Sequence, residues 1–235
     1  MSDMPLHLFV HLPKTAGQAV RTHMRQHIPD RRAFAALNAQ DEDRRDEILS
    51  ELKARGPRLK LLMGHRVDRA VALEFAHRPI RLGIVLRDPS SYVVSRFNWN
   101  VQGRNLEPNA VETVQIFHRW LRSKGNPQAR WLLTAYGGQD RDAVAALDEA
   151  ALLQQASEIL DAFWCVGCTS DIAETMAPFF SSLGISAPFD TRKNVAGRDY
   201  PRSVDATEPR IVEPVERNTR VDAALYTRYA GARSG

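Results

Sequence analysis

One stretch of the sequence, His-Leu-Pro-Lys-Thr-Ala-Gly-Gln at residues 11–18, has the composition of an anion-binding loop. Small residues leave the backbone N–H groups of such a loop open to a ligand, and the dipole of a following helix favours negative charge. Lys14 adds a full positive charge and Thr15 adds a hydroxyl donor. The sequence therefore predicts an anion-binding site, although the same pattern also suits a plain strand-to-helix turn with a surface lysine.

A second stretch, residues 87–95, could hold another anion. Arg87 offers a guanidinium fork and Ser95 a hydroxyl, and both groups bind phosphate. Two neighbouring anion sites fit a ligand with two separated phosphate groups. The alternative is structural, with Arg87 paired to Asp88 in a turn and Ser95 packed within a helix.

His65 is the candidate for proton transfer. A neutral imidazole can accept a proton near neutral pH. His65 follows an apolar run that ends in Met-Gly, just as the other two stretches follow apolar runs. Asp68 is the reserve candidate for a base, whereas His7 and His11 are expected to pack within the protein.

The apolar pattern predicts how the fold brings these stretches together. Short apolar runs predict four strands, at residues 6–10, 59–63, 80–86 and 163–167. Helical spacing and helix-start signals predict helices at residues 17–28, 89–100, 111–121, 126–136, 141–161, 171–182 and 221–230. This alternation predicts a single α/β domain over the whole chain, a P-loop-like parallel sheet with helices on both faces. Such sheets bind ligands at the carboxyl ends of their strands, where all three stretches begin.

Other features carry weaker expectations. Residues 31–55 mix charged and apolar side chains, which predicts one or two surface helices. Residues 196–218 hold three prolines among charged residues, which predicts an extended, mobile segment. Cys165 and Cys168 have the C-x-x-C spacing, but zinc needs four ligands and a redox pair needs a helix start. We therefore expect two packed thiols and no metal site.

The composition fits one globular domain. Of the 235 residues, 43% are hydrophobic and 26% are charged, which excludes a wholly disordered chain or a disulfide scaffold. The formal net charge of +4 is too small to indicate a nucleic-acid partner. No apolar run approaches the ~18 residues of a membrane span, and the N-terminus lacks the pattern of a signal peptide. We therefore expect a cytoplasmic protein.

Taken together, the motifs resemble those of the sulfotransferase superfamily. The resemblance rests on Pro13-Lys14-Thr15-Ala16-Gly17 and on Arg87-Asp88-Pro89 followed by Ser95. The most similar group is the carbohydrate type, which includes the heparan-sulfate 2-O-sulfotransferases and their bacterial relatives and uses 3′-phosphoadenosine 5′-phosphosulfate (PAPS). Weaker landmarks of that group follow in order at residues 63–65, 126–132, 166–167 and 193–195, and at Asp222 with Leu225-Tyr226.

This resemblance implies a role for the first loop. It would surround the 5′-phosphosulfate of PAPS with Lys14, Thr15, Ala16, Gly17 and Gln18. Lys14 would also neutralise the charge that develops on the bridging oxygen as the S–O bond breaks. The family usually has a hydroxyl residue where this chain has Gln18, and position 19 is alanine, so hydroxyl ligands common in the family are absent here.

The resemblance also implies roles for the other stretches. Arg87 and Ser95 would hold the 3′-phosphate, and His65 would take the proton from an acceptor hydroxyl. The product would be adenosine 3′,5′-bisphosphate, and no metal would be required. Lys193 could add to the positive field around the phosphates, although a solvated lysine is the simpler interpretation.

The resemblance implies a hydroxyl acceptor, and we expect a glycan or a small metabolite, while a lipid or a protein tyrosine stays open. Arg96 and Arg104 would suit an anionic glycan. Tryptophans can stack on sugars, but Trp99, Trp120 and Trp131 are expected in the core.

Two other functions stay open at this point. The first is a P-loop-like kinase or other phosphoryl transferase, which usually carries a Gly-Lys pair and carboxylates for magnesium that are not evident here. The second is a non-catalytic nucleotide-binding relative, which the residues at positions 18 and 19 support and which intact Lys14, His65, Arg87 and Ser95 oppose.

Overall fold

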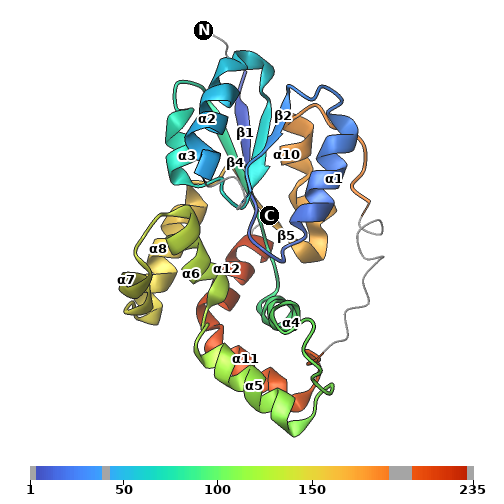
Figure 1. The fold of residues 1–235 in the computed structure, drawn as a ribbon, viewed down its shortest axis with the longest axis vertical. Coiled ribbons are helices and arrows are strands. Elements are labelled where there is room, and N and C mark those ends of the chain that lie inside the picture. The colour runs from blue at the N-terminus through green and yellow to red at the C-terminus, as the bar shows by residue number, and fades with distance from the viewer. Residues whose placement is uncertain (1–3, 39–42, 191–202, 232–235) are drawn as a thin grey trace.

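The structure is a computed structural model that describes residues 4–38, 43–190 and 203–231 (Figure 1). Its centre is a five-stranded parallel sheet with the strand order β2-β3-β1-β4-β5. The strands are β1 (Leu6–Val10), β2 (Phe34–Ala36), β3 (Leu61–Gly64), β4 (Ile80–Leu86) and β5 (Cys165–Cys168). The predicted α/β fold with a parallel sheet is confirmed.

The four predicted strands are all present, although β3 and β5 each begin two residues later than expected. The expectation of helices alone over residues 31–55 is wrong at β2. Its three residues, Phe-Ala-Ala, are too few to show a strand pattern, and they form a strand because they pair with β3, with Phe34 opposite Leu61. The later part of that segment is helical, as predicted.

Helices connect and cover the strands. They are α1 (Gly17–His27), α2 (Arg45–Ala54), α3 (Arg69–Glu74), α4 (Pro89–Asn100), α5 (Val111–Arg122), α6 (Pro127–Trp131), α7 (Arg141–Ala145), α8 (Glu149–Asp161), α9 (Ile172–Thr175), α10 (Ala177–Ser182), α11 (Pro209–Asn218) and α12 (Arg220–Gly231). Helix α4 begins as predicted, with Asp88 accepting the Ser91 N–H at 2.9 Å and Pro89 in its first turn. None of the helices in these ranges is long and apolar enough to cross a bilayer.

Three of the predicted helices are divided. Residues 126–136 form α6 and then a π-helical turn, η3 (Leu132–Tyr136), which the Gly137 N–H closes on the Leu132 carbonyl at 2.8 Å. Residues 141–161 form α7 and α8, because Asp148 caps a new helix by accepting the Ala151 N–H. Residues 171–182 form the two short helices α9 and α10.

The sheet separates two apolar cores. Leu8 and Val10 of β1 face a core shared with α2, α3, α4 and α8, whereas Phe9 between them faces a core shared with α1, α9 and α10. Figure 1 shows α1 and α10 on one side of the sheet and α2 and α3 on the other. The expectation of helices on both faces is therefore confirmed.

The two cysteines are packed thiols, as expected. Cys165 and Cys168 are the ends of β5, and both are buried and free of a disulfide. The Cys165 sulfur lies 3.4 Å from the Thr175 carbonyl and 3.9 Å from the Met176 sulfur. These contacts place the Cys165 thiol in the interior of the protein.

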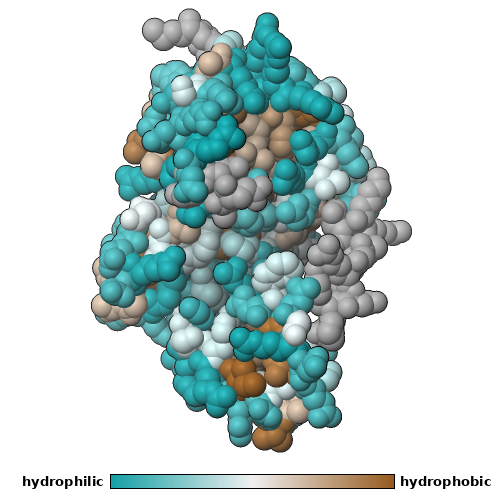
Figure 2. Space-filling model, in the orientation of Figure 1, coloured by the Kyte–Doolittle hydropathy of each residue, from teal (hydrophilic) through white to brown (hydrophobic). Residues whose placement is uncertain are grey.

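The prediction of an extended segment over residues 196–218 is wrong where the structure describes it from residue 203. Residues Pro209–Asn218 form α11, which packs against α5 and buries Ile211 and Val215. Pro209 lies in the first turn, where no N–H is needed, and Pro214 leaves the Arg210 carbonyl without its helical donor. His118 of α5 replaces that donor, with its Nε2 2.7 Å from the Arg210 carbonyl. Figure 2 shows apolar surface near these two helices, and the exposed hydrophobic residues of α5 and α11 include Val111 and Val212.

Candidate active site

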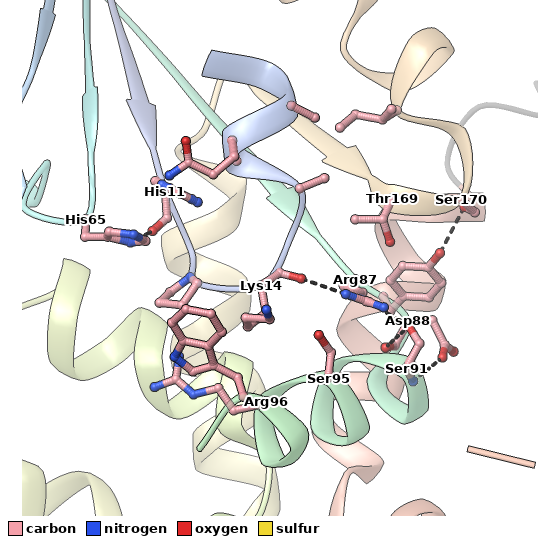
Figure 3. Close-up of a pocket in the computed structure, with 18 of the residues that line it drawn as sticks. His11, Lys14, His65, Arg87, Asp88, Ser91, Ser95, Arg96, Thr169 and Ser170 are labelled. Carbon is pink, nitrogen blue, oxygen red and sulfur yellow. Dashed lines mark hydrogen bonds between the residues drawn. The ribbon is translucent and has the colours of Figure 1, made fainter. Parts of the chain in front are cut away.

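A cavity of about 860 Å³ opens at the carboxyl ends of the strands (Figure 3). It brings together the three stretches that the sequence singled out, which follow β1, β3 and β4. The predicted site residues on its wall are Lys14, Ala16, Gly17, Gln18, His65, Arg87 and Ser95. The predicted convergence of these stretches is therefore present in the fold.

The loop after β1 has a strained backbone that suits anion binding. Lys14 has a φ of 69° and Ala16 a φ of 62°, the left-handed region that costs a non-glycine residue about 1–2 kcal/mol. Ala16 also stands at the N-cap of α1 and supplies no side-chain acceptor. The first N–H groups of a helix have no acceptor within it, so those of α1 are left for an external anion.

Thr15 has a task within the loop that the sequence did not predict. It is buried, and its hydroxyl donates to the Leu12 carbonyl at 2.8 Å. The side chain therefore holds the turn closed and is not part of the cavity wall, in contrast to the expected hydroxyl ligand. A Thr that bonds a carbonyl three residues earlier is a local turn device, which the residue type alone does not distinguish from a ligand.

Gly17 is required because the His11 ring occupies the space of a side chain there. A Cβ at position 17 would lie 1.9 Å from both Cδ2 and Nε2 of His11. His11 is itself held in place by a stacked contact with His65, with ring centroids 3.9 Å apart and planes 21° apart. The glycine thus lets the start of α1 approach the pair of imidazoles.

We expect Gly17→Ala to destabilise the protein by about 1–3 kcal/mol, because overpacking forces the His11 ring or α1 to move. Thermal unfolding measures the loss. Gly125→Ala is the control, since a Cβ there would meet its nearest neighbour, the Asn218 carbonyl, only at 3.4 Å. Equal melting temperatures for the two variants would contradict the steric account.

The orientation of His65 leaves Nε2 as its proton-accepting nitrogen. Its Nδ1 lies 2.7 Å from the His11 carbonyl, which accepts only, so Nδ1 carries the proton and Nε2 keeps its lone pair. Burial lowers the pKa of His65, the nearby Arg96 charge lowers it further, and the bond to the His11 carbonyl opposes both. Burial lowers the pKa of His11 to about 3, with His65 and Arg21 adding to the effect. Both rings are therefore neutral at pH 7.

Arg87 joins the second stretch to the first. Its Nη1 donates to the Lys14 carbonyl at 3.0 Å and its Nε donates to the Ser91 hydroxyl at 2.9 Å. Burial lowers the pKa of the guanidinium, which nevertheless stays charged. Asp88 caps α4. The guanidinium thus bridges the loop and the start of α4. The alternative interpretation of the sequence, a plain turn with Arg87 paired to Asp88, does not account for these two bonds.

Three cavity residues of α4 lie at a spacing of four. Ser91, Ser95 and Trp99 follow one another at helical spacing and all line the cavity. Sequence reasoning missed Ser91, which the same spacing from Ser95 could have indicated. The expectation that Trp99 belongs to the core is wrong, since 47% of it is exposed and the Lys14 Nζ lies 4.7 Å from its ring centroid.

The remaining wall residues include Arg96, which the sequence had offered for the acceptor, and residues after β5 that the sequence had not connected to the site. Arg96 of α4 lies on the wall, whereas Arg104 is exposed in the loop after α4 and does not line the cavity. Ser170, after β5, accepts a hydrogen bond from the Tyr226 hydroxyl of α12 at 2.9 Å. Apolar wall is supplied by Ile172 and by Phe189. Only the fold brings these segments together, so no local pattern could have found them.

A smaller cavity of about 380 Å³ adjoins the first and shares Lys14, Arg87, Ser91, Ser95 and Trp99 with it. Its far wall is the segment that begins at Val204. Asn98 of α4 fixes that segment by donating to the Val204 carbonyl and accepting the Val204 N–H, both at 3.0 Å. Lys14 and Arg87 therefore face two connected spaces.

The remaining candidates have structural roles. His7 packs at 5.4 Å from the Phe179 ring, its Nε2 lies 2.7 Å from the Ser182 hydroxyl, and burial lowers its pKa to about 4. Asp68 caps α3 and pairs with Arg45 at 2.8 Å, so it is not a free base. Trp120 and Trp131 pack against the core, as expected. Residues 193–195 lie outside the described residues.

Comparison with known proteins returns no match, either to a protein-family model or to a curated protein. The chemistry open to the site follows from its geometry. That geometry combines a helix N-terminus, the Lys14 ammonium and the Arg87 guanidinium with a neutral imidazole whose Nε2 carries a lone pair. Such a site can bind a ligand with two anionic groups and accept a proton beside one of them.

Proposed function

We propose that this protein transfers the sulfuryl group of PAPS to a hydroxyl acceptor. The observation that supports this most is the single cavity that holds Lys14, Arg87, Ser95 and His65 together. A donor with a 5′-phosphosulfate and a separate 3′-phosphate needs two anion sites and, beside one of them, a base for the acceptor. Each of these three requirements has a candidate group on the cavity wall.

The two anion sites divide the nucleotide between them. The loop at the start of α1 would hold the 5′-phosphosulfate through its backbone N–H groups and Lys14. Arg87 and Ser95 would hold the 3′-phosphate, whereas the Ser91 hydroxyl accepts from Arg87 and donates to the Asp88 carbonyl. Arg87 keeps hydrogen-bonding capacity for this, because its two assigned bonds use Nε and Nη1 of a five-donor group.

The chain supplies proton transfer and charge stabilisation. His65 Nε2 takes the proton of the acceptor hydroxyl as the new O–S bond forms. Lys14 stabilises the phosphate oxygen that leaves with the electron pair of the old S–O bond. Charge stabilisation of this kind is usually the largest catalytic contribution, and positioning supplies much of the rest.

The acceptor would approach between His65 and the exposed side of α4. Arg96 and Trp99 line the cavity there, and Arg96 is close enough to His65 to lower its pKa. A guanidinium beside an exposed indole suits a saccharide ring or a small polar metabolite. We therefore propose a glycan or a small hydroxyl metabolite as the acceptor.

The decisive experiment is a comparison of nucleotides by thermal shift. We expect adenosine 3′,5′-bisphosphate to stabilise the protein more than AMP, ADP or ATP does at the same concentration. At 100 times its dissociation constant, the bisphosphate should add about 2.7 kcal/mol to the free energy of unfolding. Arg87→Ala should lose most of this advantage, because the 3′-phosphate loses its guanidinium. Arg58→Ala, an exposed arginine at the opposite end of β3 from the cavity, should keep it.

Either alternative function gives a different pattern. Equal or greater stabilisation by ATP with magnesium would favour a phosphoryl transferase. No stabilisation by any nucleotide would contradict a PAPS-binding site.

A further inference from the structure

A buried glutamine outside the cavity is paired with the backbone of Arg87. Gln128 of α6 accepts the Arg87 N–H with Oε1 at 3.0 Å and donates to the Arg87 carbonyl with Nε2 at 2.7 Å. Only 2% of Gln128 is exposed. Strand β4 ends one residue earlier, at Leu86. The side-chain amide thus holds the Arg87 backbone just beyond the last residue that pairs within the sheet.

Gln128 is in turn held by the C-terminal helix. Asp222 of α12 is 1% exposed, and its two carboxylate oxygens accept the N–H groups of Gln128 at 3.0 Å and Ala129 at 2.8 Å. Asn126, which begins α6, accepts the Val221 N–H at 2.9 Å with its side chain. These bonds join α6 and α12 at the first turn of each helix, so the backbone of Gln128 is held in place.

The fixed backbone of Arg87 matters because its guanidinium has more than one task. The guanidinium holds the Lys14 carbonyl and the Ser91 hydroxyl while it faces the cavity. A small rotation of the backbone at position 87 would move the charged group by more than a hydrogen bond tolerates. Phosphate recognition by an arginine fork depends on such geometry.

We propose that Gln128 is a positioning residue for the second anion site: it holds the Arg87 backbone so that the guanidinium can bind the 3′-phosphate and the Lys14 loop together. This inference rests on the proposed nucleotide specificity. It assigns a function to a side chain that does not line the cavity. A purely structural glutamine would contribute to stability and leave the choice between ligands unchanged.

The test is therefore a ratio of affinities. Isothermal titration calorimetry gives the dissociation constants of adenosine 3′,5′-bisphosphate and of AMP, which lacks the 3′-phosphate. Gln128→Glu keeps the size and one acceptor but loses the donor to the Arg87 carbonyl, and Gln128→Met loses both bonds at similar volume. We expect either variant to lower the preference for the bisphosphate about 10-fold.

Two further variants separate positioning from stability. Thr113→Val removes another buried hydrogen bond, from the Thr113 hydroxyl to the Glu107 carbonyl, and should leave the preference unchanged. Adding Gln128→Met to Arg87→Ala should lower the preference no further, because the two residues act through one group. Additive losses in that double variant would contradict the proposal.

The outcomes distinguish the positioning role of Gln128 from the proposed PAPS-dependent function on which it rests. A wild-type protein that binds both nucleotides equally would overturn both. A wild-type preference that persists in folded Gln128→Glu and Gln128→Met would overturn the positioning role alone. If neither Gln128 variant folds, Asp222→Asn serves as the test. It replaces one of the two carboxylate oxygens that accept N–H groups of α6, at nearly constant volume. A preference for the bisphosphate equal to that of the wild type would then overturn the positioning role.

Discussion

Replacement of Lys14 by alanine should lower the rate of the proposed sulfuryl transfer by about 10²–10³-fold. The ammonium is one of the full charges on the cavity wall and the only one within the loop that starts α1. The charge on the leaving phosphate grows as the S–O bond breaks, so the interaction strengthens in the transition state. The loss should therefore fall on kcat more than on KM.

The measurement is a radiolabelled or coupled transfer assay once an acceptor has been found. Lys14→Arg keeps the charge and should recover part of the rate. Lys124→Ala, which removes an exposed lysine after α5, should change nothing. A Lys14→Ala protein with a rate within about threefold of the wild type would rule out this role for the ammonium.

Replacement of His65 by asparagine should lower the rate by about 10²–10⁴-fold, the usual contribution of a general base. The asparagine amide can take the place of Nδ1 and donate to the His11 carbonyl, so the local structure is preserved while the lone pair of Nε2 is lost. His77→Asn, an exposed histidine after α3, should retain the full rate.

The pH dependence gives the role a second signature. Burial lowers the pKa of His65 below 6.5, so the base is neutral at pH 7 and becomes protonated only in acid. The rate should rise with pH through a pKa below 6.5 and then level off, and His65→Asn should lack this limb. A rate limb centred above pH 7 in the wild-type protein would contradict the assignment of His65 as the base.

Folding must be checked at each pH in that experiment. Burial lowers the pKa of His7 to about 4 and that of His11 to about 3, so the unfolded chain binds protons at these positions more readily than the folded one. Stability from these groups is fully present above pH 6.5 and is lost as the pH falls toward those values. Circular dichroism at each pH separates loss of the base from loss of the fold.

The sequence predicted the parts of this molecule that short-range patterns define. Apolar runs located four strands, and Asp88 with Pro89 located the start of α4. The rule that ligands bind at the carboxyl ends of parallel strands then placed Lys14, His65 and Arg87 in one region, and all three line one cavity.

The sequence could not predict what depends on contacts between distant segments. Strand β2 exists because it pairs with β3, and Pro214 is tolerated in α11 because His118 replaces a missing donor. The pairing of Gln128 with the Arg87 backbone spans 41 positions, and nothing in the local sequence of either residue indicates it. Thr15 is a case in which the residue type was misleading. A hydroxyl in this loop suggested an anion ligand, but its hydrogen bond to the Leu12 carbonyl makes it part of the turn.

The bond between Asp222 and α6 has a consequence for synthesis on the ribosome. Asp222 is translated 94 positions after Gln128, which at 5–20 residues per second is a delay of about 5–20 s. Strands β1 to β4 and the loop of Lys14 emerge well before the helix that fixes Gln128 and, through it, Arg87. If the proposed nucleotide site exists, the nascent chain therefore forms its sheet before that site is complete, because Gln128 is fixed only after α12 has left the exit tunnel.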